Sequence, residues 1–251
     1  MRPPSLILCS NPRSGSTLLC DLLAASGVCG RPASFYRSQS IEDYAEQFGM
    51  SAYDHATPES FERAYLSGVL QAGRDTTGRF ALRLMAENRP QLAERLAVLH
   101  PELTTDAERF SAAFGPSLYV HLSRGDKLAE AISLLRAEQT GLWHMGADGS
   151  ERERSAPAQP ASYDADRIAA HLDRLTAYDR SWADWFATNG IAPLVLRYEE
   201  LAEDPRRELA RVLVALGEDR AIAATIAPRT ARLADAESAD WAARFRAERN
   251  P

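Results

Sequence analysis

Cysteine is scarce in the sequence, and the patterns that pair cysteines or use them as metal ligands are absent. The three residues, Cys9, Cys20 and Cys29, are odd in number and include no close pair of the kind that zinc sites and redox centres require. The five histidines also lack the spacing of metal ligands. The composition therefore predicts reduced core thiols in a cytoplasmic protein and a site that uses no metal ion.

Long apolar runs and an excess of positive charge are absent as well. No run approaches the roughly 20 apolar residues of a membrane span, and the apolar stretch before Asn11 is too short for the core of a signal peptide. The 251 residues include 29 Lys and Arg against 35 Asp and Glu, a net charge of −6. We therefore expect no transmembrane segment and no nucleic-acid partner, although this balance still permits a local basic pocket.

Two stretches share the pattern of a buried strand, a polar loop and an amphipathic helix. Residues 5–9 and 118–122 are short apolar runs, and each is followed by a polar turn. Leucines and isoleucines then recur at helical spacing, and Gly27 stands where the first helix should end. This pattern is typical of a parallel sheet with helices on its faces.

The rest of the chain continues the alternation of strands and helices. We expect strands at residues 80–85 and 193–197, and helices at residues 91–99, 105–114, 166–187 and around 209–216. No repeat or linker divides the chain, so the sequence predicts one α/β domain over residues 1–251 with a mostly parallel sheet flanked by helices. Residues 146–162 are rich in Gly, Pro and Ser and predict a mobile loop, either an inert surface loop or a lid over an acceptor site.

The polar loop after the first strand has the composition of an anion site. A loop between a strand and a helix directs its backbone N–H groups and the positive helix end toward one point, which suits phosphate or sulfate. Glycine permits close approach, hydroxyls add donors, and arginine makes forked contacts with anionic oxygens. The candidate residues are Pro12, Arg13, Ser14, Gly15, Ser16 and Thr17. The loop is not a Walker A motif, because Ser16 stands where the lysine should follow Gly15; a helix start with no ligand is the alternative.

A second basic residue is expected at the same edge of the sheet. Arg124 follows the strand at residues 118–122, and the carboxyl ends of parallel strands meet at one edge. On the next helix Glu130, Ser133 and Ala137 share a face that we expect to point away from the core. Arg124 and Ser133 are therefore candidates to bind a second anionic group of a nucleotide, although an ordinary exposed serine is the simpler interpretation of Ser133.

These residues carry a resemblance to a known family. The run at residues 12–19, with Arg124 and Ser133 nine apart, resembles sulfotransferases that use 3′-phosphoadenosine 5′-phosphosulfate (PAPS), and more narrowly the bacterial carbohydrate branch typified by trehalose sulfotransferase. The similarity extends in order over residues 27–32, 84–85, 136–143, 181–186, 232–235 and 241–245. It thus spans nearly the whole chain and implies a P-loop-like sulfotransferase architecture.

The resemblance also implies roles for individual residues. Residues Arg13 to Thr17 would hold the 5′-phosphosulfate, and Arg124 and Ser133 the 3′-phosphate, while a hydroxyl of a small carbohydrate or a glycolipid would accept the sulfuryl group. Arg13 would neutralise charge that develops on the leaving phosphate. Ser34 stands where the trehalose-sulfating members have a glutamate base. Serine is a poor base, so Ser34 is expected at the acceptor in a positioning role.

The departure at Ser34 leaves several readings open. Another residue takes the acceptor proton, with Glu138, His55, His144 and Glu87 as candidates, or the acceptor differs, or activity is lost. The rival functions are a nucleotide-dependent phosphotransferase, disfavoured by the missing lysine, and a catalytically impaired nucleotide-binding protein of the same fold. A homodimer is a further hypothesis. It rests on the family and on five large aromatics that form either an interface or part of the core: Trp182, Trp185, Phe186, Trp241 and Phe245.

Overall fold

The computed structural model describes residues 5–50, 57–146, 148–228 and 236–249 of the chain. Its six strands are β1 (Ser5–Ser10), β2 (Phe80–Met85), β3 (Ser117–Ser123), β4 (Leu142–Met145), β5 (Glu151–Arg154) and β6 (Leu194–Arg197). Its ten α-helices are α1 (Ser16–Ser26), α2 (Ile41–Gln47), α3 (Pro58–Gly73), α4 (Arg89–Leu99), α5 (Asp106–Phe114), α6 (Lys127–Thr140), α7 (Ala165–Thr188), α8 (Tyr198–Glu203), α9 (Pro205–Leu216) and α10 (Ala236–Arg249). Three short 3₁₀ helices are η1 (Ser38–Ser40), η2 (Ala86–Asn88) and η3 (Arg220–Thr225).

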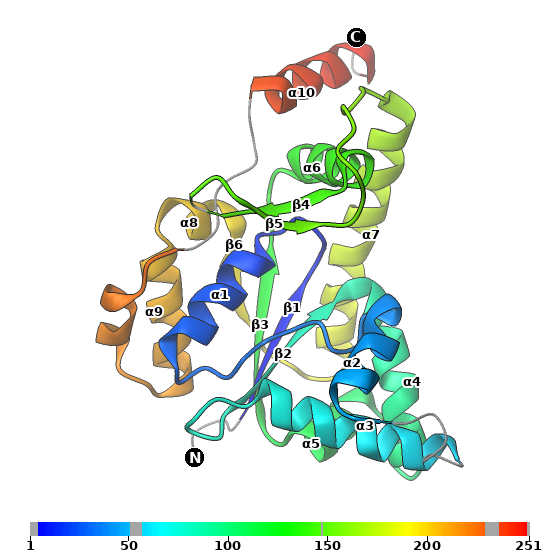
Figure 1. The fold of residues 1–251 in the computed structure, drawn as a ribbon, viewed down its shortest axis with the longest axis vertical. Helices are drawn as coiled ribbons and strands as arrows, with labels where there is room; N and C mark the ends of the chain where they lie inside the picture. The colour runs from blue at the N-terminus through cyan, green and yellow to red at the C-terminus, as the bar shows by residue number, and fades with distance from the viewer. Residues whose placement is uncertain (1–4, 51–56, 147, 229–235, 250–251) are drawn as a thin grey trace.

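Four of the strands form one parallel sheet in the order β2-β1-β3-β6 (Figure 1). β1 lies in the middle and is buried along its whole length, as its continuous apolar sequence predicts. The register pairs Ser10 with Met85 on one side and with Leu122 on the other, so the three strands end at nearly the same level. The loops that follow them therefore meet at one edge of the sheet.

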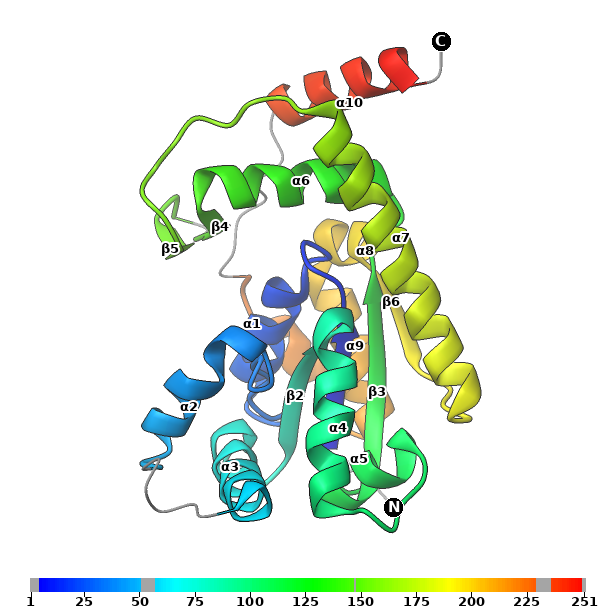
Figure 2. The same ribbon diagram turned by 90° about the vertical axis from the view of Figure 1, so that its right-hand side faces the viewer.

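Helices cover both faces of this sheet (Figures 1 and 2). Leu6 and Leu8 of β1 pack with leucines of α1, α8 and α9 on one face. Ile7 and Cys9 point the other way and pack with apolar side chains of α3, α4, α5 and α7. The predicted α/β fold with a mostly parallel sheet between helices is confirmed.

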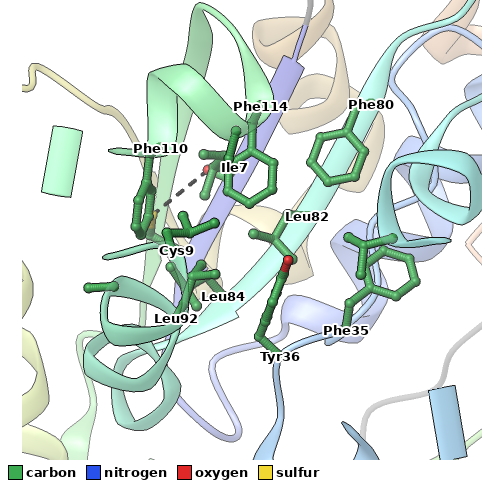
Figure 3. Packing of buried hydrophobic residues seen from close by; sticks show 14 of the residues in the cluster. Ile7, Cys9, Phe35, Tyr36, Phe80, Leu82, Leu84, Leu92, Phe110 and Phe114 are labelled. Atoms are coloured by element: carbon green, nitrogen blue, oxygen red, sulfur yellow. Dashed lines mark hydrogen bonds between the residues drawn. The ribbon is translucent and has the colours of Figure 1, made fainter. Parts of the chain in front are cut away.

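Aromatic side chains fill the core between the sheet and the helices α3, α4 and α5. Figure 3 shows Phe80 and Phe114 beside Ile7 and Leu82, and the two phenylalanine rings stack with their centroids 5.2 Å apart. Cys9 lies in this core, and burial raises the pKa of its thiol. Cys20 and Cys29 are buried and unpaired as well, in agreement with the expectation of core thiols.

The segment expected as a loop at residues 146–162 is partly a strand. Residues Glu151–Arg154 form β5, which pairs antiparallel with β4. Arg154 Nη1 donates a hydrogen bond to the carbonyl oxygen of Thr140 at 2.6 Å, and Trp143 Nε1 donates to Ser155 Oγ at 2.9 Å. The expectation of an unstructured stretch was therefore wrong for these residues, because contacts to the end of α6 compensate for their exposed, charged composition. The mobility of the remaining residues stays a prediction.

The five aromatic side chains considered for a dimer interface are all buried within the chain. Trp182, Trp185 and Phe186 lie against the sheet, with at most 5% exposure. Trp241 and Phe245 of α10 pack on α6 and α7. These rings belong to the core, so they no longer support an interface between two copies.

Candidate functional site

The loop between β1 and α1, residues 11–15, bends its backbone toward the start of the helix and is called the anion loop below. Ser14 N donates to the carbonyl of Asn11 at 3.4 Å, with Pro12 at the second position of this turn. Arg13 has a φ of 65° and Gly15 a φ of 87°. Left-handed residues at alternate positions direct successive N–H groups toward one point, an arrangement that binds anions.

Arg13 has a backbone conformation that residues other than glycine rarely adopt. It is the only described residue other than glycine with a positive φ, a conformation that costs about 1–3 kcal/mol and that surrounding interactions must offset. Its Nε donates to Ser133 Oγ at 3.0 Å, and its Nη1 donates to the carbonyl of Trp143 at 2.5 Å. Burial, and then the neighbouring charge of Arg124, lowers the pKa of Arg13 to about 10. The guanidinium is thus charged at neutral pH and placed where an anion would stabilise it.

In the described structure, the start of α1 has neither a side-chain cap on its first N–H groups nor an acidic residue of its own in its first turn. Gly15 is required by packing as well as by its φ, since a Cβ there would lie 2.6 Å from the Tyr198 ring. The helix N-terminus and the loop therefore form one positive surface with close backbone approach.

Arg124 lies at the same edge of the sheet, as predicted. It follows β3, and its Nη1 is 3.4 Å from the carbonyl oxygen of Arg13. Its guanidinium stacks 4.6 Å from the centroid of the Tyr198 ring. The side chain is buried, and its Nε has no partner among the described residues. Tyr198 therefore lies between Arg124 and Gly15 and links the two loops.

The face of α6 that contains Ser133 differs from the prediction. Glu130 and Ala137 are buried rather than directed away from the core, because α7 and α10 pack on one side of α6 and the anion loop lies near the other. Ser133 is half-buried, and its hydroxyl accepts from Arg13. The structure thus brings Arg13, Arg124 and Ser133 together, while a separate second anion site at Arg124 and Ser133 stays a prediction.

A network of charged side chains on α6 and α7 supports the first residue of the anion loop. Asn11 Nδ2 donates to Asp179 Oδ1 at 2.5 Å, and Lys127 Nζ lies 2.7 Å from both Asp179 Oδ2 and Glu130 Oε2. Glu130 is fully buried, and desolvation raises its pKa to about 7. Helices α6 and α7 thereby fix the first residue of the loop.

A cavity of about 470 Å³ opens in front of the loop. It is lined by seven of the nine predicted site residues, which are Pro12, Arg13, Gly15, Ser16, Thr17, Ser34 and, on α6, Ser133. Two predicted residues do not line it. The hydroxyl of Ser14 is buried and donates to the Asn11 carbonyl, and Arg124 lies behind Tyr198.

On the other side of the cavity, Arg83 joins Ser34 to the anion loop. Arg83 Nε donates to Ser34 Oγ at 2.7 Å, and Arg83 Nη1 donates to Thr17 Oγ1 at 2.9 Å. Thr17 Oγ1 also lies 2.9 Å from His144 Nε2. Burial, followed by the charges of Arg13 and Arg83, lowers the pKa of His144 to about 3, so its ring is neutral at physiological pH.

Two of the proposed bases are poorly suited to accept a proton. Glu138 lines the cavity, but its carboxylate is surrounded by three nitrogen groups, at 3.0 Å from Arg167, 3.1 Å from His171 and 3.3 Å from Arg174. His144 has too low a pKa to compete well for a proton. His55, another candidate, lies outside the described residues, as do residues 232–235 of the resemblance.

Glu87 is the candidate base with the least engaged carboxylate. It lines the cavity just after β2, and among the described residues its carboxylate has one hydrogen-bond partner, the Tyr178 hydroxyl at 3.4 Å. A carboxylate with few partners keeps its lone pairs available for a hydroxyl proton. The geometry therefore favours Glu87 over the other described candidates.

The sequence alone did not indicate several residues of the cavity, notably Arg37, Arg83, Glu153 and Tyr198. Arg83 is the one charged residue of the apolar strand Phe80–Met85, directly before the quoted residues 84–85. A lone arginine near the carboxyl end of a buried strand was the available signal. Tyr198 follows β6 in the same way that Arg124 follows β3.

Neither a metal-ligand cluster nor a membrane span is present among the described residues. These residues contain no group of three or more His, Cys, Asp or Glu side chains arranged to hold a metal ion. None of the described helices is both long enough and apolar enough to cross a bilayer.

The parallel sheet, the anion loop and the buried arginines define a class of protein that binds a phosphorylated or sulfated group at the carboxyl edge of a sheet. A family model described as Stf0 sulphotransferase matches residues 5–248, so the chain belongs to the Stf0 sulfotransferase family. This membership confirms the predicted sulfotransferase activity class.

Two relatives that are similar over nearly their whole length agree with the family. A trehalose 2-sulfotransferase from Mycobacterium tuberculosis (strain Erdman) is 31% identical, over 98% of this chain and 95% of the relative. A trehalose 2-sulfotransferase from Mycolicibacterium smegmatis is 28% identical, over 97% and 95%. Among solved structures, a sulfotransferase from Alicyclobacillus acidocaldarius aligns with a TM-score of 0.48 and 16% identity, over 99% of this chain and 96% of that one.

Proposed function

We propose that the protein transfers the sulfuryl group of PAPS to a hydroxyl of a carbohydrate or glycolipid. The observation that carries this proposal is the anion loop with Arg13 at its tip, in a chain whose relatives are named trehalose 2-sulfotransferases. A sugar hydroxyl is accordingly the expected acceptor.

The donor fits the residues present at the loop. None of the three guanidinium groups of Arg13, Arg83 and Arg124 forms an ion pair with a carboxylate in the described part of the chain, although Arg124 is buried and the other two are partly buried. Buried cations are normally paired. In our proposal the loop N–H groups, Arg13, Ser16 and Thr17 bind the 5′-phosphosulfate. Arg124 and Ser133 bind the 3′-phosphate.

The transfer itself requires position and charge more than covalent help from the protein. The sulfur–oxygen bond to the 5′-phosphate breaks, a sulfur–oxygen bond to the acceptor hydroxyl forms, and the hydroxyl proton leaves. Arg13 and the start of α1 stabilise the negative charge that grows on the leaving phosphate. Glu87 accepts the proton, and Ser34 holds the acceptor by a neutral hydrogen bond. A carboxylate in the cavity favours an active enzyme over an impaired nucleotide-binding protein.

The proposal also includes a location and an oligomeric state. A cytoplasmic location agrees with three buried, unpaired cysteines. A homodimer remains a prediction that no longer rests on the five core aromatics. Light scattering at micromolar concentration tests it, and a particle of only 27.6 kDa would contradict the dimer.

Ligand-dependent thermal unfolding tests the proposed donor. The product 3′,5′-adenosine bisphosphate (PAP) should raise the melting temperature, because a ligand at about 100 times its Kd adds roughly 2.7 kcal/mol of stability. ATP at the same concentration should give a smaller shift, since its charge lies on one end of the nucleoside. A larger shift with ATP than with PAP would favour a phosphotransferase.

A further inference from the structure

Arg83 occupies a position between the two sides of the cavity that no structural requirement explains. Its side chain rises from β2, where the register pairs it with Leu8 of β1. It donates one hydrogen bond to Thr17 at the start of α1 and one to Ser34 in the loop after α1. Both partners are neutral hydroxyls, which water could satisfy equally well.

The charge of Arg83 is also left without compensation. Among the described residues no carboxylate lies within ion-pair distance of it, and its side chain is only partly exposed. An uncompensated cation in a partly buried position is costly for stability. Its presence is therefore better explained by an anionic ligand than by the fold.

The two partners identify where such an anion would lie. Thr17 belongs to the loop and helix start that form the anion site, and Ser34 lines the opposite part of the cavity. A guanidinium has five N–H donors, and the two bonds leave others free to face the cavity. An anionic group that lies between the loop and the acceptor could therefore accept two parallel hydrogen bonds from the Arg83 guanidinium.

We propose that Arg83 binds the oxygens of the sulfuryl group in transit, an inference that rests on the proposed function. During transfer the sulfur leaves the phosphate oxygen and joins the acceptor oxygen, and its three other oxygens keep their negative charge throughout. The acceptor proton goes to Glu87, and the electron pair of the broken bond stays on the 5′-phosphate of the released PAP. Arg83 contacts the transferred group itself, whereas Arg13 acts on the phosphate that is left behind.

A comparison of two ligands isolates this contact. PAPS and PAP carry nearly the same total charge at neutral pH, and only PAPS has the sulfuryl group. Replacing Arg83 by Met should weaken PAPS about 10- to 100-fold, the range of a charge-assisted contact, and leave the Kd of PAP within about threefold. Titration calorimetry without acceptor measures both values.

The matched control is Arg37→Met, which removes an equal charge from the same cavity wall without touching Thr17. It should change PAPS and PAP affinity by similar factors. Arg83→Lys keeps the charge but loses the fork, so it should recover only part of the PAPS affinity. Thermal unfolding of each variant shows whether it is folded, and Arg83→Lys provides the comparison if Arg83→Met is not.

The outcomes separate this inference from the function on which it rests. Failure of the unaltered protein to bind either PAPS or PAP overturns the proposed function. Binding of both, with an unchanged PAPS to PAP ratio in Arg83→Met and Arg83→Lys, overturns the role of Arg83 alone. An unchanged ratio together with a raised KM for the acceptor would assign Arg83 to an anionic acceptor instead.

Discussion

The two halves of the cavity are built in different ways. The proposed donor half is formed by the loop and helix start at residues 11–17, with Ser133 on α6 and Arg124 behind Tyr198. It uses backbone and side chains that mostly follow adjacent parallel strands. The proposed acceptor half, made of Ser34, Arg83, Glu87 and His144, gathers side chains from a loop, a strand, a 3₁₀ helix and a hairpin. The donor half is thus determined by the fold, and the acceptor half by which side chains it carries. Acceptor choice can therefore change by substitution while donor binding is kept.

The largest loss of kcat/KM is expected in the donor half, where turnover and PAPS binding fall together. Arg13→Ala removes the cation at the tip of the loop and its bonds to Ser133 and Trp143. Loss of one preorganised donor typically costs about 10²–10³ in turnover, and weaker PAPS binding adds to this loss in kcat/KM. Steady-state kinetics with PAPS measures it. The control is Arg246→Ala, which removes an arginine from an exposed position on α10. An Arg13→Ala enzyme with near-normal kcat/KM would refute the role of the loop.

Glu87→Gln tests the acceptor half, and we expect a loss of activity nearly as large as that of Arg13→Ala. The amide keeps the shape of the side chain but is a far weaker base, so turnover should fall about 10²–10⁴-fold. The Kd of PAP should stay unchanged, because Glu87 lies away from the loop. Glu153→Gln, at another carboxylate of the cavity, should cost much less. Full activity in Glu87→Gln would require a different proton acceptor.

Arg124→Ala examines whether the donor is held at two ends. Loss of a charged hydrogen bond of about 1.5–3 kcal/mol should weaken PAP by roughly 10- to 150-fold. Adenosine 5′-phosphosulfate, which lacks the 3′-phosphate, should bind the variant almost as it binds the unaltered enzyme. Competition binding with both nucleotides gives the two Kd values. Equal losses for the two ligands would mean that Arg124 acts through Tyr198 and the loop instead.

The smallest effect is expected at Ser34. Ser34→Ala removes one neutral hydroxyl, which contributes about 0.5–1.5 kcal/mol, so turnover should fall less than about tenfold. PAP affinity should be unchanged. Measuring kcat at saturating PAPS, with the fold checked by thermal unfolding, decides the case. Abolished transfer with an intact nucleotide site would make Ser34 central to the chemistry and leave Glu87 without its role.

The loop and helix start of the donor half, at residues 11–17, could be predicted from the sequence because their determinants are local. The apolar run before the loop, the glycine at residue 15 and the helical spacing after it stand within about two dozen residues. The strand at Phe80–Met85 was predicted with its observed bounds, and the long helix α7 within a residue at each end. Regular periodicity sets these elements, so few tertiary contacts are needed to recognise them.

Ser34, Glu87 and His144 of the acceptor half were candidates from the sequence, but Arg83 and the contacts that join these residues could not be predicted, because the contacts are long-range. Arg83 is 49 residues from Ser34 and 66 residues from Thr17 in the sequence. No motif or periodicity connects residues at such separations, so the sequence does not indicate these two hydrogen bonds. The strand β5 has the charged sequence Glu-Arg-Glu-Arg, which gives no apolar alternation and is held instead by the end of α6. The buried face of α6 was misjudged for a related reason, since α7 and α10 cover a side that its own sequence leaves mixed.

The most direct test of the proposed reaction is transfer of the sulfuryl group from PAPS to a sugar, followed by mass spectrometry of both products. The enzyme is incubated with PAPS and a panel of carbohydrates and glycolipids that includes trehalose, with Arg13→Ala in parallel. We expect PAP and one sulfated acceptor to form in equal amounts with the unaltered enzyme and far more slowly with the variant. Release of PAP that does not depend on any acceptor, or phosphorylation of a sugar from ATP with none from PAPS, would contradict the account.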